Sequence, residues 1–391
     1  MFQTNMWCYL WDLVDEGIDK VLDRLQGEAG ITGISVATFY HSVDQLRPHA
    51  GVLPKRFLSP GGAQFQPQAD RYTGTRIKPA AASWLKKSNP LAKVAEACEK
   101  RKLALRGWTV CCHSSLMVSK YSNGAVKNVF GDIDPTWLCP INPDVREYLR
   151  AMVEDLSGNY PFETIELERP TFQERPHSHA HYKVGIELGE VGHWLSDLCF
   201  CESCRQAAVD DGIDAGAAAK AAGAALEKIF AGGDPLEQSI EEFMGDVPVL
   251  SDYVDWRCAK VASLVETIKQ SCKCRIVVHR AGGRFVAAAD FKTIGPYCDA
   301  TLSNCPHPYT DQTIDETVNE ALKDTGEISH VELGFNAFSP FCPDSATLVR
   351  SVSHVAKLGV PSVNIYNYGL IPLSRMEWIR RATRYAGREA D

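Results

Sequence analysis

The sequence lacks the features that direct a chain to a membrane or to nucleic acid. Its N-terminal stretch, MFQTNMWCYLWDLVDEG, has no basic leader, and Asp12, Asp15 and Glu16 interrupt it before any apolar run suits a signal peptide or a membrane span. A net charge of −8 at pH 7 opposes general affinity for nucleic acid or anionic lipid. We therefore expect a cytoplasmic protein with a small or neutral ligand, and no nucleic-acid or membrane partner.

Two further absences bear on the fold. No Ser/Gly-rich linker divides the 391 residues, so we expect a single domain over 1–391. No Gly-rich phosphate turn follows the first expected strand (31–40), although doubly wound open sheets often carry one. Cysteine, by contrast, is abundant. Most of the 14 cysteines should be free, buried thiols in a reducing compartment.

Strand and helix patterns alternate along the chain. In the second half, strand-like segments start ~25–32 residues apart, which is the length of one βα unit. The seven expected strands are 31–40, one that ends in WTVCC, 162–168, 274–279, 299–303, 329–335 and 361–368. This pattern predicts an α/β fold, a (β/α)8 TIM barrel or close variant, with a doubly wound open sheet as the alternative.

The eighth strand is less clear in the sequence. Between 169 and 260 the only strand candidate is YKVGIEL (182–188), and an inserted helical subregion is expected at about 200–260. Long loops after the first two strands, 41–82 and 113–142, should project from the carboxyl ends of the strands, where barrels build their active sites.

Carboxylates near those strand ends suggest hydrolytic chemistry. Burying a carboxylate inside a strand is costly unless it is paired or used. Glu166 and Glu168 share one face of their strand, and Glu332 lies among apolar residues of another. Glycoside hydrolysis needs two such groups, so we expect Glu168 as general acid/base and Glu332 as nucleophile or second carboxylate. The alternative is structural ion pairing of these glutamates with Arg169, Lys183 or Arg280.

Other polar and aromatic side chains would bind the substrate at the same face. The expected substrate-binding residues are His41, His113, His177, His181, His279, Asn336 and Tyr366. Trp84, Trp108, Trp137, Tyr366 and Tyr368 would suit stacking against sugar rings.

The segment RPHSHAHYK supports a second hypothesis. His177, His179 and His181 alternate, so an extended backbone would place them on one side, where with His279 they could hold a metal in a hydrolase or lyase. Barrel metallohydrolases usually begin with a His-x-His pair on the first strand, whereas this strand ends FYHSV. A third hypothesis is a non-catalytic sugar-binding barrel.

Three cysteines cluster in LCFCESCRQAA. Cys199, Cys201 and Cys204 could wrap a tetrahedral zinc ion with a fourth ligand from Cys139, His193 or the 111–112 pair. Packed free thiols are the alternative, and the small βαβ context of a thioredoxin-like site is missing. No cofactor is expected for the chemistry itself.

Several motifs occur in the order of a known group of proteins. LCPINPDVREYLRAMVEDL, IELE, LCFCESCRQAA and YNYGLIP resemble uncharacterised bacterial glycoside-hydrolase-like TIM barrels. Cys-x-Cys-x2-Cys also resembles a segment of family 42 β-galactosidases, where one earlier cysteine completes a structural zinc site. That family has Asn-Glu just before these cysteines, whereas Glu190 lies here in LGEVGHW. The resemblance implies a barrel acting on a carbohydrate. The sugar, the linkage and a homo-oligomeric state stay open.

Overall fold

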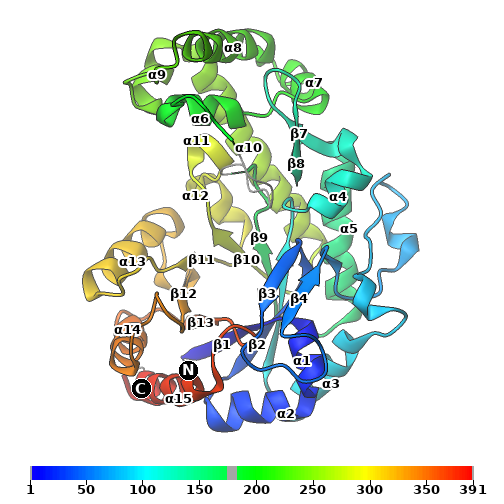
Figure 1. Ribbon diagram of the computed structural model, residues 1–391, viewed down its shortest axis with the longest axis vertical. Helices are drawn as coiled ribbons and strands as arrows, with labels where there is room; N and C mark the ends of the chain where they lie inside the picture. Colours follow the sequence, from blue (N-terminus) through cyan, green and yellow to red (C-terminus); the bar gives the residue numbers. More distant parts are fainter. Residues whose placement is uncertain (1, 174–182, 390–391) are drawn as a thin grey trace.

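The computed structural model describes residues 2–173 and 183–389, and its centre is a closed barrel of eight parallel strands (Figure 1). β1 pairs with both β13 and β2, and this double pairing closes the barrel. The strands in barrel order are β1 (Gln3–Cys8), β2 (Gly33–Tyr40), β6 (Ala104–Val110), β9 (Thr164–Glu168), β10 (Arg275–Arg280), β11 (Ala300–Asn304), β12 (Val331–Asn336) and β13 (Ser362–Tyr366). The predicted (β/α)8 TIM barrel is confirmed.

The eighth strand is the N-terminal segment β1, and the prediction of a strand at 182–188 was wrong. Residues 183–188 form no strand, and residue 182 lies outside the described residues. β1 escaped recognition because its polar residues are buried. The Thr4 amide donates to Thr32 Oγ1 at 2.9 Å, and Asn5 Nδ2 donates to Asn364 Oδ1 at 3.1 Å. These bonds satisfy polar groups that a hydrophobic pattern would place at the surface.

Helices cover the outside of the barrel. After β1 come α1 (Leu10–Glu16) and α2 (Ile18–Asp23), and α3 (Pro90–Arg101) follows β2. The helices of the later units are α5 (Pro143–Asn159), α10 (Pro248–Ser271), α11 (Arg284–Ala287), α12 (Phe291–Ile294), α13 (Asp311–Thr325), α14 (Ser345–Lys357) and α15 (Met376–Glu389). None of the helices in the described part of the chain is both long and apolar enough to cross a membrane.

Two kinds of insertion extend the barrel. Between β9 and α10 lie α6 (Gly189–Asp197), α7 (Glu202–Asp210), α8 (Ala215–Gly232) and α9 (Ile240–Asp246), which gather at one end of the molecule (Figure 1). The loops after β2 and β6 carry β3 (Val43–Leu46), β4 (Arg56–Ser59), β5 (Gly62–Ala63), α4 (Ser115–Lys120), β7 (Ala125–Lys127) and β8 (Ile133–Leu138). β3 pairs with β4, and β7 with β8, as antiparallel ribbons.

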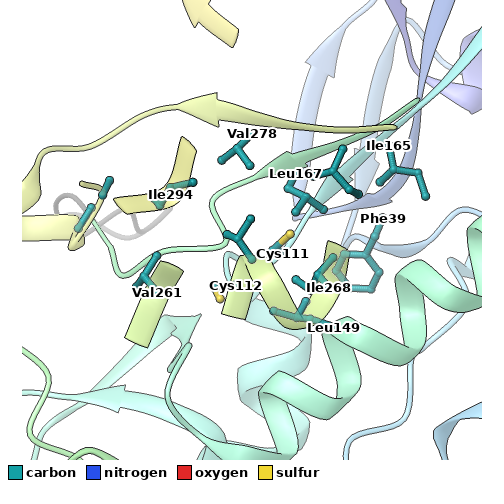
Figure 2. Packing of buried hydrophobic residues seen from close by; sticks show 14 of the residues in the cluster. Phe39, Cys111, Cys112, Leu149, Ile165, Leu167, Val261, Ile268, Val278 and Ile294 are labelled. Carbon is teal, nitrogen blue, oxygen red and sulfur yellow. The ribbon is translucent and has the colours of Figure 1, made fainter. Parts of the chain in front are cut away.

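The main core lies between the strands and their helices. Figure 2 shows Ile165 and Leu167 of β9 in the same cluster as Leu149 of α5 and Ile268 of α10, all four fully buried. Ile165 and Leu167 point outward, toward the helices. Because side chains alternate along a strand, Glu166 and Glu168 point toward the barrel interior. The packing of one face thus fixes the direction of the glutamates on the other.

Candidate active site

A cavity of about 400 Å³ opens inside the barrel at the carboxyl ends of the strands. Its lining comes mostly from the last residues of separate strands, which is where TIM barrels place their active sites. The lining residues are Trp7, Tyr40, His41, Trp108, Glu168, Arg169, His279, Ala281, Asn304, Asn336 and Tyr366. Of the residues expected in the site, Glu168, His41, His279, Asn336 and Tyr366 therefore meet at one cavity.

Glu168 is the carboxylate of this cavity. It is the last residue of β9 and is partly exposed, and Trp108 Nε1 donates a hydrogen bond of 2.5 Å to its Oε2. No other carboxylate belongs to the cavity lining among the described residues. The bond to Trp108 fixes one carboxylate oxygen, and within residues 2–173 and 183–389 no hydrogen bond holds the other, which can therefore meet a ligand.

Glu166 lies one layer deeper, two residues before Glu168. It is completely buried, and its carboxylate accepts hydrogen bonds from Arg106 Nε at 2.6 Å and Trp7 Nε1 at 2.8 Å, with His279 Nε2 at 3.2 Å. Burial raises the pKa of Glu166, but the Arg106 charge and the bonds from His279 and Trp7 outweigh it and lower the pKa to about 2. Glu166 is therefore ionised and braces the floor of the cavity.

Glu332 lies at the other end of the barrel interior. It is the second residue of β12, only 1% exposed, and outside the cavity lining. Arg106 Nη2 donates to its Oε2 at 2.7 Å, and Asn364 Nδ2 donates to the same oxygen at 3.2 Å. Asn336, which does line the cavity, is four residues further along β12, or about 13 Å. The structure thus does not bring Glu332 to the cavity beside Glu168.

Aromatic rings form the walls of the cavity. Trp7 and Trp108 lie with ring centroids 6.2 Å apart, and Tyr366 meets Trp108 edge-on at 5.9 Å. The Tyr9 hydroxyl links that of Tyr366, at 2.8 Å, to that of Tyr40, at 3.1 Å. Burial raises the pKa of all three tyrosines, so their hydroxyls stay protonated at neutral pH and can donate hydrogen bonds.

The remaining expected residues lie around or away from the cavity. The His113 ring stacks between His41, at 4.6 Å, and Trp137, at 4.8 Å, so it supports a lining residue. Tyr368 is buried, and its hydroxyl bonds Glu16 at 3.0 Å. His177, His179 and His181 lie outside the described residues, so the structure does not place the expected histidine metal site.

Some lining residues were missed by the sequence reasoning. Trp7 was hidden because its strand was not recognised. Asn304 and Tyr40 end strands that were predicted, so applying the strand-end rule to every strand would have found them.

Four buried cysteines form a second site, outside the cavity lining. The sulfur atoms of Cys139, Cys199, Cys201 and Cys204 all lie within 4.8 Å of one another. Cys139 to Cys204 is 3.5 Å and Cys204 to Cys199 is 3.7 Å. A tetrahedral zinc ion with Zn–S bonds of ~2.3 Å holds its sulfurs roughly 3.8 Å apart, so the donor set fits zinc in type and spacing. Hydrogen bonds from the other three thiols lower the pKa of Cys201 and favour a thiolate.

The fold is shared with carbohydrate-active enzymes. The structure is similar to the PgaB (BpsB) glycoside hydrolase domain from Bordetella bronchiseptica, with a TM-score of 0.60, 10% identity and 95% of each chain covered. It is also similar to α-L-fucosidase isoenzyme 2 from Paenibacillus thiaminolyticus (TM-score 0.58, 12% identity) and to β-galactosidase from the psychrophilic Marinomonas ef1 (0.57, 11%).

The similarity to the last two enzymes covers only part of their chains. In each comparison 98% of this chain is covered, against 49% of the fucosidase and 59% of the galactosidase. Neither a family model nor a curated protein matches the sequence. The comparisons therefore show that the chain shares the barrel fold of these three proteins.

Proposed function

We propose that this protein is a glycoside-hydrolase-like enzyme that acts on a carbohydrate or glycoside in the barrel cavity. The observation that carries the proposal is Glu168, a carboxylate fixed by Trp108 at a strand end, in a cavity walled by aromatic rings. Aromatic faces suit the apolar faces of sugar rings, and a strand-end carboxylate suits proton transfer to a glycosidic oxygen. The barrel fold shared with glycoside hydrolases supports this function.

Glu168 acts as the general acid/base in this proposal. As an acid it gives its proton to the leaving oxygen, and as a carboxylate it takes a proton from the attacking water. Tyr366 and Asn336 hold the substrate hydroxyls, and His41 and His279 line the same cavity. Glu332, paired with Arg106 away from the cavity, serves as a brace in place of the second reacting carboxylate expected from the sequence.

The experiment is turnover of a panel of aryl glycosides by the wild type and two matched variants. Glu168→Gln should lower kcat by ~10²–10⁴-fold while substrate affinity stays nearly intact, because only proton transfer is removed. Glu190→Gln is the control, since Glu190 is exposed on α6 and, in the sequence, precedes the cysteines at about the distance of the family 42 glutamate. Loss of turnover in Glu190→Gln alone would contradict the assignment. Sugar binding without any wild-type turnover would favour the non-catalytic barrel.

We also propose that the four-cysteine group holds a structural zinc ion. It contributes no residue to the cavity lining, so the ion would fix the junction between Cys139 and the start of α7 and take no part in the reaction. The chemistry at Glu168 needs no cofactor in this proposal.

A further inference from the structure

A second pair of cysteines lies at the opposite end of the barrel from the cavity. Cys272 immediately follows helix α10, and Cys274 immediately precedes β10, with their sulfur atoms 3.5 Å apart. β10 is six residues long, so roughly 16–20 Å of strand separate this pair from the carboxyl end that faces the cavity. Neither the proposed reaction nor the proposed zinc site uses these two thiols.

The pair is accessible, unlike most cysteines of this chain. Cys272 and Cys274 are partly exposed, as is Cys298, whereas the other eleven are buried. A thiol must reach solvent to meet an external reagent, so these three are the candidates for reaction in the folded protein.

Basic side chains flank the pair along the chain. Lys269, Lys273 and Arg275 lie within seven residues of sequence, and Lys273 and Arg275 are exposed. Two nearby acidic groups are paired: Asp299 with Lys269, and Glu154 with Arg150, whose Nη1 also reaches Ser271 Oγ at 3.4 Å. A third, the exposed Glu163, lies beside Arg275, whose amide donates to the Glu163 carbonyl at 3.2 Å. Nearby cations favour a thiolate and attract an anionic reagent.

The two thiols are not equivalent. The hydrogen bond from Cys274, with a smaller contribution from the charge of Lys269, lowers the pKa of Cys272 to about 7. The contact between the two thiols raises the pKa of Cys274. Burial raises the pKa of the third accessible cysteine, Cys298, to about 12. Of the three accessible thiols, Cys272 is therefore the one that most readily becomes a thiolate at neutral pH.

We propose that Cys272 and Cys274 form a thiol–disulfide exchange site for a small anionic disulfide, of which glutathione disulfide is the probe. The Cys272 thiolate attacks one sulfur of the disulfide, forms a mixed disulfide and releases one thiolate. Cys274, after losing its proton to that thiolate or to solvent, attacks the Cys272 sulfur, closes the Cys272–Cys274 disulfide and releases the second thiolate. The protein dithiol is oxidised by two electrons, and the probe is reduced to two thiols.

The first test measures alkylation of the folded protein by iodoacetamide across pH, followed by peptide mass spectrometry. We expect Cys272 to react at least about tenfold faster than Cys298 at pH 7, because its larger thiolate fraction outweighs its lower intrinsic nucleophilicity. Its rate should reach half of its maximum near the pKa of about 7. Equal rates at Cys272 and Cys298 would overturn the proposal.

The second test incubates the wild type and three variants with glutathione disulfide. The wild-type peptide that spans 272–274 should lose two hydrogens, whereas Cys274→Ser should stop at one attached glutathione. Cys272→Ser should show neither product, and Cys298→Ser, the matched control, should behave as the wild type. The proposal fails if the wild-type peptide is unchanged or if Cys272→Ser takes up glutathione on this peptide as the wild type does. Because neither test measures sugar turnover, failure here is separate from failure of the proposed glycosidase activity.

Discussion

Arg106 explains how the barrel interior holds two buried carboxylates. Its guanidinium, 2% exposed, bonds Glu166 through Nε and Glu332 through Nη2. Sequence periodicity correctly predicted that Glu166 and Glu168 share one face of their strand. It could not show that an arginine from β6 bonds both Glu166 and Glu332. Whether a glutamate of these strands reaches the cavity therefore depends on its depth within the barrel, which strand patterns do not encode.

The first prediction concerns removal of that arginine. Arg106→Met should lower the free energy of unfolding by about 3–5 kcal/mol, because two buried charges lose their partner. Urea unfolding curves measure the change. A triple variant that also carries Glu166→Gln and Glu332→Gln should recover part of the loss, since the uncompensated charges are gone. A loss below ~1 kcal/mol in the single variant would show that water compensates these carboxylates.

The second prediction follows from the lowered pKa of Glu166. A carboxyl whose folded pKa, about 2, is below its ordinary value of 4.5 adds stability above pH 4.5, and this contribution disappears as the pH falls from 4.5 toward 2. Glu166→Gln should therefore flatten the dependence of the urea midpoint on pH over this window. Glu190→Gln, at an exposed position, should leave the slope unchanged. If the urea midpoint of Glu166→Gln depends on pH as steeply as that of the wild type, Glu166 is not ionised in the folded protein.

Secondary-structure elements were predictable where burial and hydrophobicity agree. All seven expected strands exist, because their outer faces are apolar and pack against helices. β1 differs, since Thr4 and Asn5 are buried and bonded to Thr32 and Asn364. The partners of Thr4 and Asn5 come from distant parts of the chain, so local pattern alone could not reveal this strand.

The third prediction tests the junction between Cys139 and helix α7. Protein purified without added metal should contain about one zinc ion per chain, and Cys201→Ser and Cys139→Ser should lose it. Their melting temperature should fall by about 5 °C or more, because a bound metal stabilises only the folded chain. Cys298→Ser serves as the control and should keep both metal and melting temperature. If the wild type contains no metal and has the same melting temperature as the variants, the four cysteines are packed free thiols.

At the scale of the whole molecule, β1 closes the barrel between β13 and β2. The same strand carries Trp7, which lies against the cavity and bonds Glu166. Closure of the barrel and construction of the site therefore depend on one short segment.

The fourth prediction is that deletion of residues 1–8 prevents cooperative folding. The deletion would leave two open strand edges and expose the aromatic interior, both of which favour aggregation. Circular dichroism and the sharpness of thermal unfolding measure the result. Deletion of residues 1–2 alone is the control, because β1 begins at Gln3. A cooperative transition in the longer deletion would show that the seven remaining strands close by themselves.

The sequence by itself determined the barrel class, seven strands and Glu168 as a strand-end carboxylate. These follow from local periodicity, since alternation and βα spacing are set by neighbours along the chain. Only the tertiary structure decided the closing strand, the pairing of Arg106 with Glu166 and Glu332, and the approach of Cys139 to the other three cysteines. Each of these joins residues far apart in sequence, and contacts of that kind depend on how the closed barrel sets the depth and direction of every side chain.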